Sequence, residues 1–191
     1  KGEDSFAIES GLPFYMIGGG WRAFARLHMH VTGYPLTILS HYQMPASAPA
    51  ELADIVADAG ALAAQQVVPS ARIAALPGAT ALLGGLVRLL KPSMLVTSVH
   101  GLREGLLFDR LSAAEKAEDP LISAARFEGS RLGRFGFHGD ALAEWLLPVF
   151  GDGDGILDRL CLAACLLADS AWHVNPEYRA VDAMKMVLDG N

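Results

Sequence analysis

The spacing of hydrophobic and polar positions predicts strands that alternate with helices in the first 111 residues. Short apolar runs predict three strands, at 14–17, 36–39 and 94–99. Apolar residues at intervals of three and four predict helices between and after them, over 21–32, 47–59, 77–90 and 101–111. This alternation is typical of an α/β arrangement.

The pattern changes after the charged run at 115–119, where the strands end. Apolar spacing in the remainder of the chain predicts only helices, over 120–127, 138–150, 156–172 and 176–188. We therefore expect an α/β domain over 1–117 followed by an all-α domain over 118–191.

Composition narrows the classes of function. Of the 191 residues, 52% are hydrophobic, which indicates a folded protein with a substantial core. The formal net charge of -6 argues against broad nucleic-acid binding, and no apolar run is long enough to span a membrane. Cys161 and Cys165 lie four apart in one predicted helix, a poor spacing for a structural disulfide. We expect free thiols and a cytoplasmic protein.

Three consecutive glycines, Gly18, Gly19 and Gly20, separate the first predicted strand from the first predicted helix. A strand, a glycine turn and a helix together present free backbone N–H groups and a positive helix end to an anion. Arg22, at the second helical position, is close enough to reach the same anion, although an ordinary solvated charge explains it as well. The stretch matches neither GxGxxG nor GxxxxGK[ST], so a phosphate site and a flexible corner both remain open.

Other polar residues carry weaker signals. Arg103 and Glu104 follow the third predicted strand, in a place where ligands gather in open α/β sheets, but a salt-bridged helix start explains them as well. His28, His30 and His41 lack the spacing of a metal site. A group of acidic residues resembles a calcium-binding loop but lacks the third ligand and the glycine of that pattern. We therefore interpret this group as part of an interhelical turn; its members are Asp152, Asp154 and Asp158.

Several motifs together resemble the exopolyphosphatase/guanosine pentaphosphate phosphohydrolase (Ppx/GppA) family in order and spacing. The more specific ones are GGGWRAFARLH at 18–28 and SVHGLREGLL at 98–107. Shorter matches are YPL, HY, LPGA, RFGFHGD, Trp145 and LCLAACLLADSAW, at 34–36, 41–42, 76–79, 134–140, 145 and 160–172. The resemblance covers nearly the whole chain.

The resemblance implies an actin-like, ribonuclease-H-like fold in which two α/β halves close over polyphosphate. Residues 1–117 then correspond to the C-terminal part of the second half, and 118–191 to the start of a degenerate, HD-like helical domain. The family's catalytic carboxylate and the acidic groups that hold Mg²⁺ belong to the N-terminal half. We therefore expect no catalytic residue here, no metal firmly bound by this chain, and no activity of this chain alone.

The family's site residues carry over position by position. Gly18, Gly19 and Gly20 match its second phosphate loop, usually Gly-Gly-Thr, so Gly20 replaces a residue that often bears a hydroxyl. Arg22 matches the arginine that follows this loop. Ala168 and Asp169 stand where related proteins carry a His-Asp pair, so this position predicts an ion pair or a cap instead of a metal centre.

The implied function is hydrolysis of terminal phosphoanhydrides of polyphosphate or guanosine pentaphosphate by a homodimeric parent enzyme that uses Mg²⁺. One alternative is a non-catalytic interaction or dimerisation module, and another is a fragment of a kinase from the same superfamily. An upstream half with glycine loops and acidic residues would favour the enzyme, and phosphoryl transfer from a nucleotide would favour the kinase.

Overall fold

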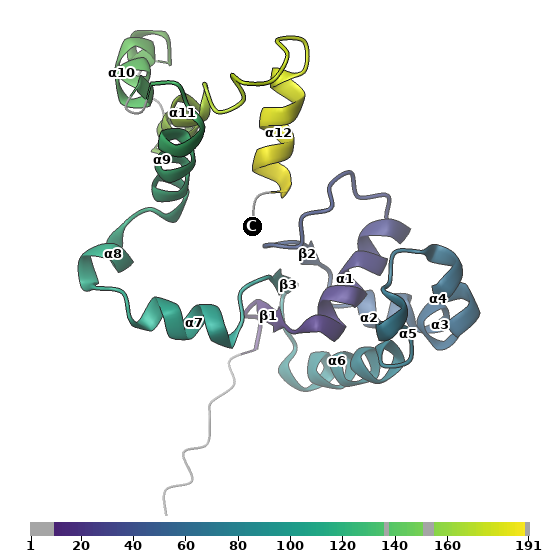
Figure 1. The fold of residues 1–191 in the computed structure, drawn as a ribbon. Coiled ribbons are helices and arrows are strands. Elements are labelled where there is room, and N and C mark those ends of the chain that lie inside the picture. The colour runs from purple at the N-terminus through teal and green to yellow at the C-terminus, as the bar shows by residue number, and fades with distance from the viewer. Residues whose placement is uncertain (1–9, 136–137, 151–154, 190–191) are drawn as a thin grey trace, which may run out of the picture. The chain divides into compact units, whose positions relative to one another are not determined.

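The structure is a computed structural model that describes residues 10–135, 138–150 and 155–189 (Figure 1). The chain divides into two compact units, Lys1–Asp109 and Arg110–Asn191. The described part of the first unit combines helices with a small three-stranded sheet, and that of the second contains helices and loops. The order predicted from the sequence, α/β and then all-α, is confirmed at this coarse level. The division between the units precedes the expected limit at residue 117.

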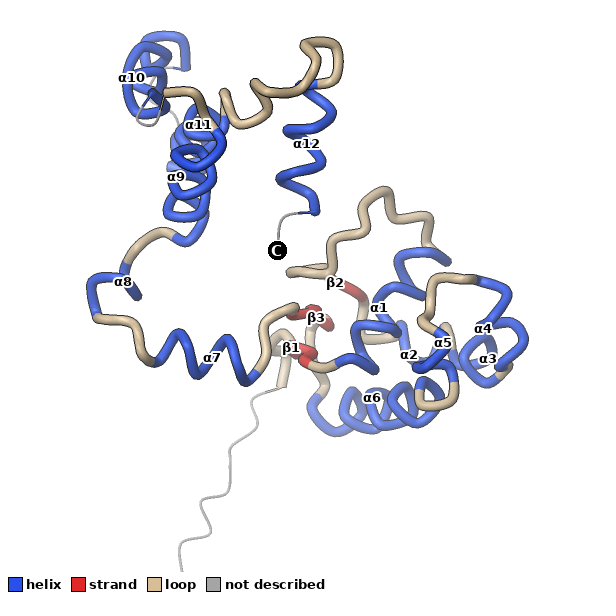
Figure 2. The backbone as a smooth tube through the Cα atoms, in the orientation of Figure 1, coloured by secondary structure: helices blue, strands red, loops and turns tan. Residues whose placement is uncertain are grey.

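The sheet has the strand order β1-β3-β2 and is drawn in red in Figure 2. Strand β1 (Phe14–Ile17) runs parallel to β3 (Leu95–Ser98), and the short strand β2 (Gln43–Met44) pairs with β3 in the antiparallel sense. The strands expected at 14–17 and 94–99 are therefore confirmed. Because β1 and β3 are parallel neighbours, the turns that follow them leave the same edge of the sheet.

The strand predicted at 36–39 is wrong, because this segment is a loop. The chain meets β3 only after His41, whose positive φ of 56° turns the backbone. The His41 N–H then donates to the Thr97 carbonyl and the Thr97 N–H donates to the Tyr42 carbonyl, both at 2.9 Å. Residues with high β propensity form a strand only where a partner strand is available, and that partner lies beside 43–44.

Seven helices are described in the first unit: α1 (Gly19–Val31), α2 (Ala48–Glu51), α3 (Ala53–Ala57), α4 (Ala59–Gln65), α5 (Ser70–Ile73), α6 (Leu76–Leu90) and α7 (Leu102–Asp109). The helices predicted at 21–32, 77–90 and 101–111 are confirmed with small shifts at their ends. The single helix predicted over 47–59 is wrong, because breaks at Leu52 and Asp58 divide the region. Asp58 is extended, and its carboxylate caps α4 by accepting from the Gly60 and Ala61 N–H groups.

The core of this unit lies between the sheet and the helices. Phe24 and Leu27 of α1, Leu83 of α6 and Leu95 of β3 are fully buried members of one cluster. Trp21 ties α1 to α6, since its indole Nε1 donates to the Ala79 carbonyl at 3.1 Å. These contacts fix the start of α1, and hence the glycine turn before it.

The second unit contains α8 (Ala113–Ala117), α9 (Pro120–Leu132), α10 (His138–Phe150), α11 (Gly155–Leu167) and α12 (Arg179–Asp189). The helix predicted at 138–150 is confirmed, and α9 extends beyond the predicted 127. The helix predicted over 156–172 is too long, because α11 ends at Leu167 and turns follow. Asp152 and Asp154 lie outside the described residues, and Asp158 lies in the first turn of α11.

Two of the arginine–aspartate pairs among the described residues connect α9 with its neighbouring helices. Arg126 of α9 pairs with Asp140 of α10, and Arg159 of α11 pairs with Asp119, the residue that caps α9. Asp119 also accepts hydrogen bonds from the Leu121 and Ile122 N–H groups. One carboxylate thus stabilises the start of α9 and its contact with α11.

Candidate phosphate-binding site

The glycine turn has the geometry that the sequence predicts, with a strand, a glycine and a helix in direct succession. Gly18 separates β1 from α1 at φ 131° and ψ 158°, a conformation that residues with a Cβ rarely adopt. Its carbonyl accepts the first helical hydrogen bond, from the Arg22 N–H at 3.0 Å. The N–H groups of Gly19, Gly20 and Trp21 precede that bond, so the helix gives them no acceptor and they form its positive end.

The turn after β3 lies beside the glycine turn. Ile17 pairs with Ser98 at the ends of β1 and β3, and a Cβ on Gly101 would lie 3.8 Å from Cγ2 of Ile17. The Ser98 Oγ bonds both the N–H and the carbonyl of His100, which closes this second turn tightly. Two helix N-termini, those of α1 and α7, therefore follow neighbouring strands at one edge of the sheet.

The N-terminus of α7 already has an acceptor from its own chain. Glu104 accepts a hydrogen bond from the Gly101 N–H at 2.6 Å. This bond is the largest cause that lowers the pKa of Glu104, followed by a bond from its own backbone, and Arg103 adds a smaller attraction. Glu104 is therefore a capping residue, whereas the N–H groups at the start of α1 have no such carboxylate among the described residues.

Gly20 has a packing role that explains its identity. A Cβ on Gly20 would lie 3.1 Å from the Cβ of Ala79, a tighter approach than most real Cβ contacts. The start of α1 is held this close to α6 by the hydrogen bond from Trp21 to the Ala79 carbonyl. A serine or threonine at position 20 would require α1 or α6 to shift by a few tenths of an ångström, and glycine avoids this tight contact between the two helices.

Two arginines lie at the start of α1. Arg22 is half-buried, and its Nε is covered but has no hydrogen-bond partner among the described residues. Arg72 comes from α5, and its Nη2 lies 2.9 Å from the position that a Cβ on Gly19 would occupy. Among the described residues, neither arginine forms an ion pair. Arg72 therefore offers an uncompensated charge beside Gly19, and Arg22 offers a second one in the first turn of the helix.

Arg72 is the site residue that sequence reasoning missed. It lies far along the chain in a helix of four residues, and no local motif links it to the glycine turn. The only available signal was its charge, which a solvated surface residue would share. Folding brings Arg72 to Gly19 because α5 packs against α1.

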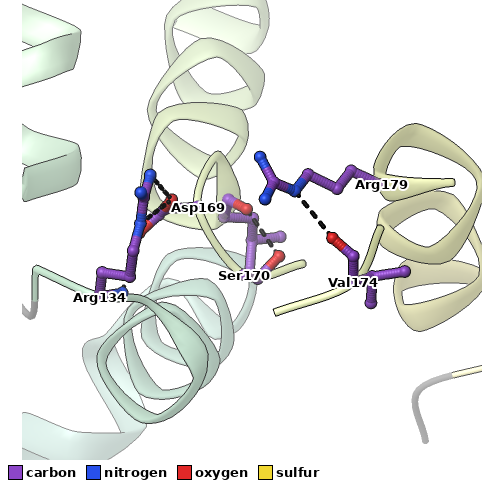
Figure 3. Close-up of polar contacts among 6 residues, drawn as sticks. Arg134, Asp169, Ser170, Val174 and Arg179 are labelled. Atoms are coloured by element: carbon purple, nitrogen blue, oxygen red, sulfur yellow. Dashed lines mark hydrogen bonds and ion pairs between the residues drawn. The ribbon is translucent and has the colours of Figure 1, made fainter. Parts of the chain in front are cut away.

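Asp169 in the second unit forms the ion pair that the sequence predicts. Its carboxylate accepts from the Arg134 Nη2 at 2.7 Å, from Nε at 3.1 Å and from the backbone N–H at 2.8 Å (Figure 3). These bonds, the side-chain bond first, hold the pKa of Asp169 below its usual value. Within the described ranges, no group of three His, Cys, Asp or Glu side chains is placed to hold a metal ion.

The remaining predictions concern a histidine of the first unit and two cysteines of the second. His28 is buried, and its Nδ1 lies 2.7 Å from the Tyr42 hydroxyl in a hydrogen bond. Cys161 and Cys165 are free thiols, as predicted from their spacing. Burial raises the pKa of the Cys165 thiol, and Cys161 adds a smaller effect in the same direction.

No protein-family model matches this chain, and no curated protein sequence does. Among the described residues, no helix combines the length and apolar character needed to cross a membrane. The motifs of the sequence and the geometry of the glycine turn are therefore the features that indicate a function.

Proposed function

We propose that this chain is the C-terminal portion of an exopolyphosphatase-like phosphohydrolase, in which the turn at Gly18 holds phosphate groups of polyphosphate or guanosine pentaphosphate. The observation that carries this proposal is the start of α1. There, the first N–H groups of the helix have no helical acceptor, the Arg72 guanidinium lies beside Gly19, and Arg22 follows in the first turn with its Nε unpartnered; no carboxylate among the described residues pairs with either arginine. The family resemblance of the motifs at 18–28 and 98–107 agrees with this assignment.

The proposed fold is the second half of an actin-like domain followed by a degenerate HD-like helical domain. The parallel pair of β1 and β3 supports the first assignment, because both of its following turns reach the same edge. The pairing of Asp169 with Arg134 supports the second, because a carboxylate committed to a guanidinium is a poor metal ligand. Both parts act as a scaffold in this proposal.

The proposed role of the turn is to bind and neutralise phosphoryl oxygens while another part of the enzyme activates water. In the parent enzyme, Mg²⁺ and the activating carboxylate belong to the other α/β half. Glu104, the carboxylate of the adjacent turn, is committed to the Gly101 N–H. We therefore propose that the 191-residue chain binds the substrate's phosphates without hydrolysing them.

The test is binding of tripolyphosphate to the complete 191-residue chain by isothermal calorimetry. Arg22→Met and Arg72→Met should each weaken binding by about tenfold or more, because each removes a charge-assisted hydrogen bond. Arg88→Met, which changes an exposed arginine on α6, is the matched control and should bind as the wild type does. Equal affinity of all three variants would contradict the proposal, as would steady phosphate release by the wild-type chain.

A second candidate is a non-catalytic dimerisation module, favoured by one face of the sheet. Tyr15 and Ile17 of β1 are 54% and 53% exposed, although alternate residues of the same strand pack toward the core. Exposed apolar side chains on a strand favour association. Sedimentation velocity of the wild type and of Ile17→Lys distinguishes the two candidate functions. A dimer that the substitution dissociates, together with no tripolyphosphate binding, would replace the enzyme assignment with the dimerisation module.

A further inference from the structure

A separate pocket of about 300 Å³ lies beside the second half of α1. Its polar lining is Arg26, His30, Tyr34 and Thr37, and its apolar lining is Met29, Leu36 and Val67. None of these residues carries a carboxylate. Arg26 lies one helical turn beyond Arg22, so the pocket is distinct from the glycine turn and from the phosphate role proposed for it.

The backbone after α1 builds one wall of this pocket. Gly33 adopts a positive φ of 64°, and the Tyr34 N–H donates to the Met29 carbonyl at 2.8 Å. This arrangement ends the helix and folds the following loop back along it. The loop that the sequence suggested as a strand therefore brings Leu36 and Thr37 to the same pocket as Arg26.

The Tyr34 ring is held in place by a buried pair behind it. It packs edge-on against Tyr42, with ring centroids 4.8 Å apart. Tyr42 is buried and its hydroxyl is fixed by the hydrogen bond to His28 Nδ1. An aromatic ring held in this way offers a rigid surface to a flat ligand, with little entropy to lose on binding.

The charge of the pocket favours an anion. Arg26 carries a permanent positive charge, and it forms no ion pair within the part of the chain that the structure describes. The C-terminal end of α1 opposes an anion weakly through its partial negative charge. Its carbonyls are engaged, however, since those of His28 and Met29 accept from the Thr32 hydroxyl as well as from backbone N–H groups. A full charge on Arg26 outweighs this partial one.

We propose that this pocket binds a small organic anion with a single aromatic ring, an aryl carboxylate or aryl phosphate. The anionic head pairs with the Arg26 guanidinium and accepts a hydrogen bond from Thr37, while the ring lies against Tyr34. The volume is at the lower end of the range for small-molecule sites, which fits a ligand with one ring.

The experiment titrates the whole 191-residue chain with benzoate, phenyl phosphate and the uncharged analogue benzamide. Binding is measured from chemical-shift changes in ¹H–¹⁵N spectra. Benzoate or phenyl phosphate should bind saturably and shift the amides of 26–37, and benzamide should bind about tenfold more weakly or worse. Arg26→Met should weaken binding of the anion by a similar factor, and Thr37→Val by less. Arg88→Met, another exposed arginine of this unit, should leave binding unchanged.

The absence of saturable binding of either anion would overturn the proposal, as would equal binding by the wild type and Arg26→Met. A phenyl phosphate signal that Arg22→Met abolishes and Arg26→Met does not would place that ligand at the glycine turn and would also overturn it. Tripolyphosphate binding distinguishes this pocket, which rests on its own observations, from the phosphate site of the proposed function. Arg26→Met should leave it unchanged, and Arg22→Met should leave benzoate binding unchanged.

Discussion

Gly129 of α9 lies so close to Leu166 of α11 that a Cβ on the glycine would be 2.1 Å from the Leu166 carbonyl oxygen. Gly139 of α10 approaches the same residue, since its Cβ would lie 2.5 Å from the Leu166 Cα. The obstructing atoms are backbone, which cannot rotate away. The close packing of three helices in the second unit therefore depends on two glycines.

Gly129→Ala and Gly139→Ala should each destabilise the second unit by about 2 kcal/mol or more, because the helices must separate to admit a methyl group. Gly155→Ala, at the start of α11 with no atom within 4 Å of its Cβ position, is the matched control and should unfold at the wild-type temperature or slightly above. Thermal unfolding followed by circular dichroism measures all three. A wild-type melting temperature for both packing variants would contradict this interpretation.

Gly18→Ala should disrupt the turn before α1, because φ 131° is strained for any residue with a Cβ even though open space surrounds it. We expect a loss of about 1–3 kcal/mol in the free energy of unfolding. Gly33→Asn is a useful comparison, since φ 64° is a left-handed conformation that asparagine tolerates. Urea unfolding should show a much smaller loss for the second variant, and equal losses would show that the Gly18 conformation is unimportant.

The pairing of Asp119 with Arg159 should make the second unit sensitive to acid. The side-chain hydrogen bond from Arg159 is the largest cause that lowers the pKa of Asp119 to about 2, with the N–H groups of Leu121 and Ile122 adding to it. Because the pKa is depressed in the folded state, the stabilisation is present above the ordinary value of 3.8 and disappears as pH falls toward 2.

Asp119→Asn tests this pH dependence while keeping an oxygen that can cap α9. Melting temperatures measured between pH 5 and pH 2 should fall less steeply for this variant than for the wild type. Added salt should narrow the difference between the two at pH 5, because both partners are exposed. Identical pH profiles would show that the pair contributes nothing measurable.

The buried pair of His28 and Tyr42 should make the first unit depend on pH in a different range. Burial is the main cause that lowers the pKa of His28 below its ordinary 6.5, although Glu51 partly opposes it. The unfolded state then binds the proton more readily, so stability should decline as pH falls through 6.5 and level off below the folded pKa. Urea unfolding at several pH values measures this decline.

Tyr42→Phe should cost about 1–3 kcal/mol at pH 7.5, because it leaves the buried Nδ1 of His28 without its partner. His30→Gln is the control, since this neighbouring histidine is exposed and has no such bond among the described residues. Its pH profile should match that of the wild type. A decline that persists unchanged in His28→Gln would assign the pH dependence to another group.

The elements that the sequence predicted correctly are those with strong local signals. The glycines that end the run at 14–17 and the apolar spacing from Trp21 onward located β1 and α1, and Pro77 located α6. The same local logic failed at 36–39, because high β propensity does not supply a partner strand. It failed again at 47–59, because the helical pattern is interrupted at Leu52 and ends at Asp58, whose carboxylate caps the next helix.

The site residues divide in the same way, into those that a local pattern predicts and those that depend on distant parts of the chain. The sequence by itself determined the turn at Gly18 to Gly20 and the position of Arg22, because a strand, a turn and a helix form from neighbouring residues. The tertiary contacts alone bring Arg72 to this turn, place Gly20 close against Ala79 and pair Asp169 with Arg134. These contacts join residues distant in the chain, and their geometry arises from helix packing that no local pattern encodes.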